Sequence, residues 1–86
     1  FKHSQICGIS YAAKEQVDAY CAEHDDPVGI VVIQEHRPVS NHIAERLGRV
    51  HQSPQLFLVH GGAVQWAATH YSITKAAMAE ARAGVA

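Results

Sequence analysis

The sequence predicts an α/β fold of the order β-α-β-α-β-β-α, in which a mixed four-stranded sheet carries helices on both faces. Three observations support this fold class. Residues 7–24 repeat apolar side chains every three or four positions, as an amphipathic helix does. Residues 28–33 form an almost unbroken apolar run, which is typical of a strand buried on both faces of a parallel sheet. Residues 55–60 and 63–68 flank two adjacent glycines, as the strands of a hairpin do.

The N-terminal part is predicted to contain one strand end and one long helix. Residues 1–3 are interpreted as the tail of a first strand whose beginning is absent from this sequence. The helix over 7–24 is stopped by Asp25, Asp26 and Pro27. Its predicted buried stripe consists of Ile9, Ala12, Ala13, Val17, Tyr20 and Cys21.

A second helix is predicted after the apolar run. Ser40 is its candidate N-cap, and Gly48 suits its C-terminal end. Its buried side is predicted to carry Val39, Ile43 and Leu47.

The C-terminal part is predicted to be the hairpin followed by an alanine-rich helix. Ser72 or Thr74 caps this helix, which ends near Arg82. The first two strands must be parallel, with a helical crossover, and the last two antiparallel. This is the minimal thioredoxin-like arrangement, and we expect residues 1–86 to form a single domain of that kind.

Composition limits the classes of partner. The formal net charge is −1, and the 7 Lys and Arg residues are mixed with 8 Asp and Glu residues. Without a basic patch, neither nucleic acid nor an anionic membrane is an expected partner. The longest apolar run is far too short to span a bilayer.

The two cysteines are predicted to be unpaired. Cys7 and Cys21 are fourteen positions apart in one predicted helix, which separates them by roughly 20 Å at 1.5 Å per residue. A disulfide needs much closer Cα atoms, so an internal bridge is excluded if the helix forms. Unpaired thiols favour a reducing compartment, and we expect the cytoplasm. Cys21 lies on the apolar stripe and is interpreted as a structural core thiol.

Cys7 is the candidate catalytic residue. It lies on the first turn of the predicted helix, where exposed amides and the positive end of the helix dipole stabilise a thiolate. Ser10 lies one turn later, in the place of the second sulfur of a Cys-x-x-Cys pair, and its hydroxyl can bond the thiolate. Lys2 and His3 are further candidate supporting residues. Two plainer interpretations stay open: Cys7 as a small buried apolar side chain, and Ser10 as a helix cap.

Ser53-Pro54 is the candidate substrate-binding segment. Proline is tolerated at the start of a strand because its missing N–H breaks no interior ladder bond. In thioredoxin-like folds a cis proline at this place exposes the backbone of the preceding residue beside the catalytic sulfur. A cis bond here would let Ser53 offer its N–H and C=O to an extended substrate, although an ordinary strand entry remains the alternative.

The seven histidines do not predict a metal site. Their spacings lack a convincing His-x-x-x-His helix pair, and no Cys-x-x-Cys accompanies them. His3 and His51 could converge near Cys7, so an iron–sulfur role is a weak alternative. We expect no metal and no bound cofactor.

Several motifs resemble one known family. The similarity covers nearly the whole chain, and its motifs occur in the family's order: Phe-Lys-His-Ser-x-x-Cys-x-Ile-Ser at 1–10, Gln-Glu-His-Arg-Pro-Val-Ser-Asn-His-Ile-Ala at 34–44, His-Gln-Ser-Pro-Gln at 51–55, and His-x-x-Ile at 70–73. They resemble the bacillithiol-system YtxJ-like proteins, the monothiol bacilliredoxin family. Gly8 departs from the proline common after the cysteine, and Gln52 from a glutamate.

The resemblance implies a bacterial, cytosolic thioredoxin-fold oxidoreductase. It would reduce mixed disulfides between protein cysteines and bacillithiol or an analogous low-molecular-weight thiol. Its partners would be S-thiolated client proteins, and the small thiol would be its co-substrate. Two alternatives of other classes remain: a non-catalytic peptide-binding module with Cys7 as a redox sensor, and an iron–sulfur carrier.

Overall fold

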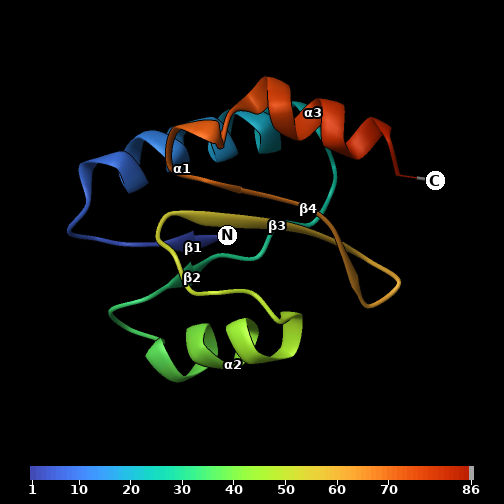
Figure 1. The fold of residues 1–86 in the computed structure, drawn as a ribbon. Coiled ribbons are helices and arrows are strands. Elements are labelled where there is room, and N and C mark those ends of the chain that lie inside the picture. The colour runs from blue at the N-terminus through green and yellow to red at the C-terminus, as the bar shows by residue number, and fades with distance from the viewer. Residues whose placement is uncertain (86) are drawn as a thin grey trace.

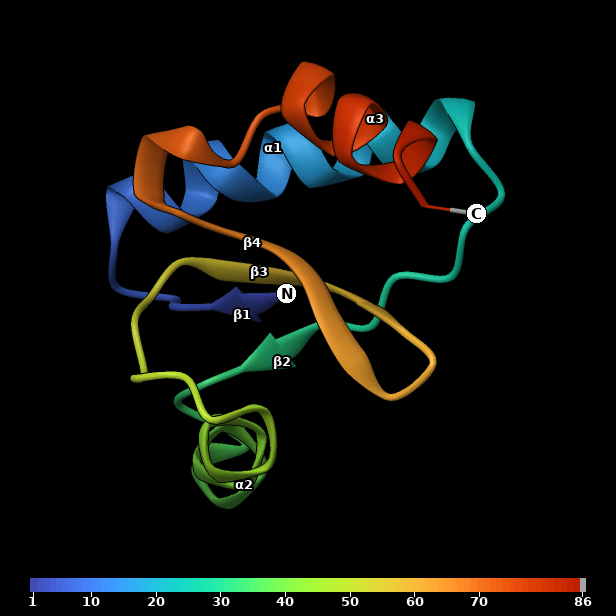
Figure 2. The ribbon, with the colours of Figure 1, turned by 45° about the vertical axis from the view of Figure 1, so that its right-hand side comes forward.

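The sheet and its helices have the predicted order. In the computed structural model, which describes residues 1–85, the sheet order is β2-β1-β3-β4, with β1 parallel to β2 and antiparallel to β3. Helices α1 and α3 cover one face and α2 lies on the other (Figure 1, Figure 2). This confirms the predicted fold class. The elements are β1 Lys2–His3, α1 Gly8–Glu23, β2 Val31–Val32, α2 Arg37–Leu47, β3 Gln55–His60, β4 Ala63–Thr69, the 3-10 turn η1 His70–Ser72, and α3 Lys75–Ala83.

The β3–β4 hairpin forms where its turn chemistry predicted it. Gly61 and Gly62 have φ values of 60° and 77°, in the left-handed region that a two-residue hairpin turn requires. The bounds of β3 are those predicted, and β4 is one residue longer. Its register shifts once, between Leu58 and Val59.

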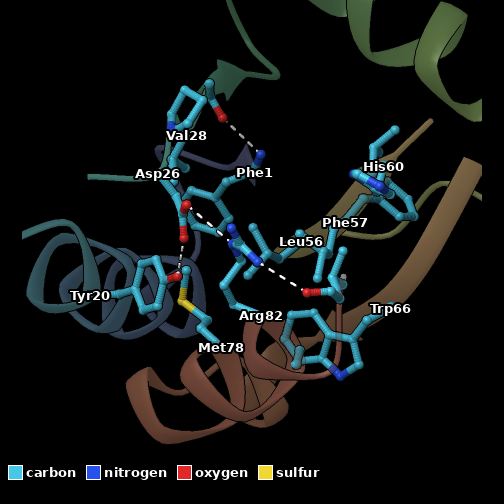
Figure 3. A pocket seen from close by; sticks show the side chains of 16 residues that line it. Phe1, Tyr20, Asp26, Val28, Leu56, Phe57, His60, Trp66, Met78 and Arg82 are labelled. Carbon is cyan, nitrogen blue, oxygen red and sulfur yellow. Dashed lines mark hydrogen bonds and ion pairs between the residues drawn. The ribbon is translucent and has the colours of Figure 1, made fainter. Parts of the chain in front are cut away.

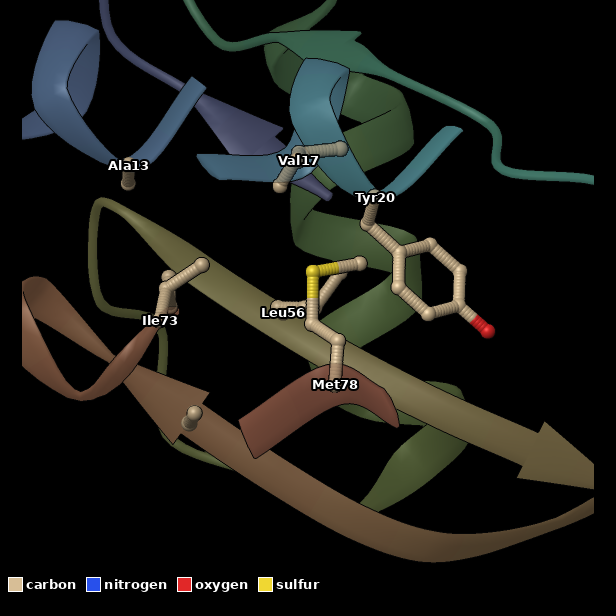
Figure 4. Close-up of a cluster of buried hydrophobic side chains, with 7 residues drawn as sticks. Ala13, Val17, Tyr20, Leu56, Ile73 and Met78 are labelled. Carbon is tan, nitrogen blue, oxygen red and sulfur yellow. The ribbon is translucent and has the colours of Figure 1, made fainter. Parts of the chain in front are cut away.

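The hydrophobic core lies between the sheet and the α1–α3 face. Figure 4 shows the α1 side chains pointing toward Leu56 of β3 and toward Ile73 and Met78. The seven members of this cluster are Ala13, Val17, Tyr20, Leu56, Ala68, Ile73 and Met78. The core thus fixes α1 on the sheet and with it the residue at the start of α1.

The predicted stripe of α1 is wrong at its edges. Ala12 and Cys21 are exposed, whereas Ser10 is buried beside Ala13 and Val17. Each step along a helix turns the side chain by about 100°, so Cys21 leaves the core although Tyr20 is inside it. The prediction of Cys21 as a core thiol is therefore wrong.

The second strand is also shorter and less covered than predicted. β2 contains only Val31 and Val32, both half-buried, and Ile30 is exposed. The reason is the position of β2 at the edge of the sheet, where one neighbour is missing. The apolar run is therefore not a strand buried on both faces.

Helix α2 begins three residues before the predicted cap. Its N-cap residue is His36, so Ser40 lies inside the helix, where it is fully buried. Val39 is 48% exposed and does not belong to the buried side. The prediction at the other end is confirmed, since Gly48 ends α2 with a φ of 63°.

Helix α3 starts at the second of the two predicted caps. The Thr74 hydroxyl oxygen accepts a hydrogen bond of 3.1 Å from the Ala77 N–H. Across residues 1–85, no helix combines the length and the apolar character that crossing a membrane demands.

Candidate functional site

Cys7 is the N-cap residue of α1. Its backbone is extended, with φ −116° and ψ 118°, and its C=O accepts the first helical bond, 3.0 Å from the Ser10 N. The side chain is half-buried. A sixteen-residue helix directs its positive end toward this position, which favours a negative charge there. The predicted placement of Cys7 is confirmed to within one residue.

The Ser10 hydroxyl is engaged elsewhere than predicted. Its Oγ accepts the Ser4 N–H at 2.9 Å and lies 2.8 Å from His3 Nδ1, and the residue is fully buried. A bond from this hydroxyl to Cys7 is not among the hydrogen bonds of the described residues. Ser10 thus ties the β1–α1 segment to the helix that follows it.

Lys2 and His3 point to opposite faces of the sheet. Successive strand residues alternate in this way. His3 packs edge-on against Tyr11 of α1, with ring centroids 4.8 Å apart. Burial lowers the pKa of His3, and the nearby charge of Lys14 adds to this. Lys2 instead directs its Nζ to His51 Nδ1, 3.1 Å away.

His3 and His51, whose convergence near Cys7 was only a weak alternative, contact different elements. His51 lies on the α2 side, where Ser40 Oγ is 3.3 Å from its Nδ1, whereas His3 contacts α1. Within residues 1–85, no group of three or more His, Cys, Asp and Glu side chains is arranged to hold a metal ion.

The Ser53–Pro54 peptide bond is cis, as the sequence analysis predicted from its place in the fold. Pro54 is buried, and its C=O accepts the His70 N–H at 3.2 Å. The Ser53 Oγ is buried and has no hydrogen-bond partner among the described residues. This segment precedes β3, at the end of the sheet where β1 leads into α1 (Figure 2).

Two glutamines that the sequence analysis gave no role hold the loops at this end. Gln34 accepts the Gln5 N–H at 3.0 Å and donates to Ser4 Oγ at 2.9 Å, which links the loop after β2 to the loop before Cys7. Gln55 accepts the Gln52 N–H at 3.3 Å and donates to the Val50 C=O at 3.1 Å. Both lie in the motifs quoted above, but a single sequence does not reveal which loop amide each one contacts.

A cavity of 350 Å³ lies at the other end of the sheet. Figure 3 shows the lining of this cavity, in which Tyr20 and Arg82 both bond to Asp26. Trp66 lies across the cavity from Phe1. The Tyr20 hydroxyl donates to Asp26 Oδ2 at 2.6 Å, and Arg82 Nε donates to Asp26 Oδ1 at 3.2 Å. Cys7 does not line this cavity and lies at the opposite end of α1.

Comparison with known proteins decides the family. The family model described as "Monothiol bacilliredoxin BrxC" matches residues 1–78. The chain belongs to this family. It is also similar to a solved structure described as a thioredoxin-fold protein with a provisional oxidoreductase role, at 32% identity and a TM-score of 0.89. That match covers 94% of this chain and 72% of the other. A bacilliredoxin-family chain on this fold has a thiol-oxidoreductase type of role.

Proposed function

We propose that this chain is a monothiol thiol–disulfide oxidoreductase. Its substrates are mixed disulfides between protein cysteines and a low-molecular-weight thiol, bacillithiol or an analogue, in the cytoplasm. The observation that carries the proposal is Cys7 at the N-cap of α1, at the same end of the sheet as the cis Ser53–Pro54 bond. Family membership supports the same reaction class.

The reaction has two exchange steps. The Cys7 thiolate attacks the small-thiol sulfur of the mixed disulfide, the old S–S bond breaks, and the client cysteine leaves as a thiolate that takes up a proton. Cys7 then carries the small thiol. A second small thiol attacks as its thiolate, forms the symmetrical small-thiol disulfide and returns Cys7 to the thiolate. Disulfide exchange proceeds through such mixed disulfides.

The chain's own residues hold the reacting groups in place. Cys7 is the N-cap residue of α1, and the N-terminus of a helix is a favourable place for a negative charge. The N–H and C=O of Ser53 would pair with the extended client segment. Ser10, with His3, acts indirectly by fixing the β1–α1 segment, since its hydroxyl bonds to His3 and Ser4. Both cysteines are free, and they lie at opposite ends of α1. Cys21 is therefore too far from Cys7 to resolve its mixed disulfide, and Cys7 would react without a second cysteine of the chain.

The test is turnover of a bacillithiolated or glutathionylated protein by wild type, Cys7→Ser and Cys21→Ser. We expect Cys7→Ser to fall to the rate of buffer with small thiol alone, because it lacks the nucleophile. Cys21→Ser is the matched control and should retain wild-type turnover. Equal rates for wild type and Cys7→Ser would refute the proposal.

A redox sensor is the second candidate function. Its supporting observation is that Cys7 has no resolving sulfur in its helix turn, so an adduct could persist. A sensor would accept one equivalent of small thiol on Cys7 and stop, whereas the enzyme releases client protein repeatedly. Client released per mole of chain separates the two.

A further inference from the structure

Lys2 is a buried cation held by an imidazole. The residue is 1% exposed, and its Nζ lies 3.1 Å from His51 Nδ1. The three salt bridges of the described residues involve other cations, Lys14, Lys75 and Arg82. Burying an ammonium without a carboxylate is costly, and burial lowers the pKa of Lys2. Because burying the Lys2 ammonium costs free energy, we infer that its contact with His51 serves a purpose in the fold.

His51 connects the loop before β3 to two elements, β1 and α2. Its Nδ1 faces both Lys2 of β1 and Ser40 of α2, and the Ser40 Oγ lies 3.3 Å away. Because an ammonium can only donate, Nδ1 must carry its lone pair and the ring hydrogen must be on Nε2. Burial lowers the pKa of His51, and the charges of Lys2 and Arg37 lower it further, which keeps this acceptor available at neutral pH.

The segment that follows His51 is held from within by Gln55. The Gln55 amide bonds to the Gln52 N–H and to the Val50 C=O, on either side of His51. Gln55 thus keeps the segment in shape, while Lys2 and Ser40 fix its position against the sheet and α2. The residues between His51 and Gln55 are Gln52, Ser53 and Pro54.

We propose that Lys2, Ser40 and His51, together called the loop anchor, are positioning residues that hold the Ser53–Pro54 backbone where the client protein pairs with it. The inference rests on the proposed reductase function and adds which residues determine client recognition. The loop anchor acts on protein substrates through the backbone of Ser53. Among the described residues, Lys2 Nζ and Ser40 Oγ both bond to His51 Nδ1 and neither bonds to the sulfur. We therefore assign Lys2 a role in positioning this loop, in place of the support for Cys7 that the sequence suggested, and expect the intrinsic reactivity of Cys7 to stay unchanged.

The test compares His51→Leu with His51→Asn. The Asn side-chain oxygen can take the place of Nδ1 and accept from Lys2, whereas Leu cannot. We expect His51→Leu to raise KM for a glutathionylated protein about tenfold, the effect of losing a hydrogen bond to a charged group. Its kcat and the rate of Cys7 alkylation by iodoacetamide should match wild type, and His51→Asn should restore KM. Lys2→Met replaces His51→Leu if that variant does not fold, with the same expected pattern.

Two results would overturn the loop anchor. One is a parallel fall in alkylation and reduction, which would mean that the cluster acts on Cys7 itself. The other is a KM that neither His51→Leu nor Lys2→Met changes, or that His51→Asn fails to restore.

The rate of amide hydrogen exchange in residues 50–55 tests the loop anchor without any measurement of reductase activity. If wild type reduces no mixed disulfide, the reductase function fails, and exchange alone decides whether the anchor exists. His51→Leu should then exchange about tenfold faster over this segment while His51→Asn exchanges like wild type. Equal exchange in all three proteins would contradict the anchor.

Discussion

The two ends of α1 carry one cysteine each and differ in almost every physical respect. At the N-terminal end, Cys7 is the half-buried N-cap, and the neighbouring loops are tied by Ser10 and Gln34. At the other end, Cys21 is exposed, beside a network in which Tyr20 and Arg82 bond to Asp26. The helix dipole presents its positive end to Cys7 and its negative end near Cys21. The comparison teaches that one end of α1 has the surroundings that the proposed thiol chemistry requires, and that the other end attaches the helix to the rest of the fold.

The largest stability effect should distinguish a core side chain of α1 from Cys21. Val17→Ala should destabilise the fold by about 2 kcal/mol, because it removes buried methyl groups and leaves a cavity. Cys21→Ala should change the free energy of unfolding by less than about 0.5 kcal/mol, because Cys21 is exposed. Urea denaturation measures both. A loss for Cys21→Ala as large as that for Val17→Ala would restore the core interpretation that the structure rejects.

The pH dependence of stability should reveal the attachment at the C-terminal end of α1. The hydrogen bond to Asp26, with burial, raises the pKa of Tyr20 to about 12. The same bond, with that from Arg82, lowers the pKa of the Asp26 carboxyl. Because the pKa of Tyr20 is higher in the folded state, its protonated phenol contributes stability below pH 10, and this contribution is lost as the pH rises through about 12. A lowered carboxyl pKa stabilises the fold above roughly pH 4, the unfolded value, and this is lost on further acidification.

Tyr20→Phe removes the hydrogen bond between Tyr20 and Asp26. The stability of this variant should therefore depend less on pH than that of wild type, at both the acidic and the alkaline end. The free energy of unfolding, measured in urea from pH 3 upward, should differ most from wild type between roughly pH 4 and 10. The difference should shrink above pH 10. Alkylation of Cys7 should be unchanged, since Tyr20 lies near the other end of the helix. A difference that stays constant into the alkaline range would argue against the Tyr20–Asp26 bond.

The smallest effect concerns Gly8, the residue after Cys7. The Cys7 backbone at ψ 118° is in the region that a residue before proline prefers, and open space surrounds the position of a Gly8 Cβ. The first helical N–H has no acceptor within a helix, so proline sacrifices no helical bond there. Gly8→Pro should therefore raise the free energy of unfolding by about 0.4–1 kcal/mol. Gly8→Ala is the control, since it adds a Cβ but not the proline ring. If Gly8→Pro lowered the free energy of unfolding, the first turn of α1 would differ from this geometry.

Apart from the cis Ser53–Pro54 bond, which was expected from its place in the fold, the details that the sequence predicted correctly depend on local chemistry. Gly61 and Gly62 require left-handed backbone whatever surrounds them, so the hairpin and the bounds of β3 could be predicted. Thr74 caps α3 through its own neighbours in the chain. The placement of Cys7 at a helix start follows from the same kind of local signal.

The incorrect predictions depend on what another element covers. An apolar run cannot tell an edge strand from a central one, so β2 was predicted to be more buried than it is. How wide the buried stripe of a helix is depends on the elements that pack against the helix, which the sequence does not show. Cys21 lies just outside the buried stripe of α1. Ser40 looks like a cap in the sequence, but its burial against His51 depends on the loop before β3. For the same reason the sequence did not predict that Lys2 and His3 have different partners.

The most direct test of the account is the rate at which each cysteine of the wild-type protein is alkylated at pH 7, followed by mass spectrometry of the two cysteine peptides. Exposure alone favours Cys21, because Cys7 is half-buried. The account predicts that Cys7 reacts at least about tenfold faster, because the thiolate at a helix N-terminus is the reacting species. Faster or equal alkylation of Cys21 would contradict it.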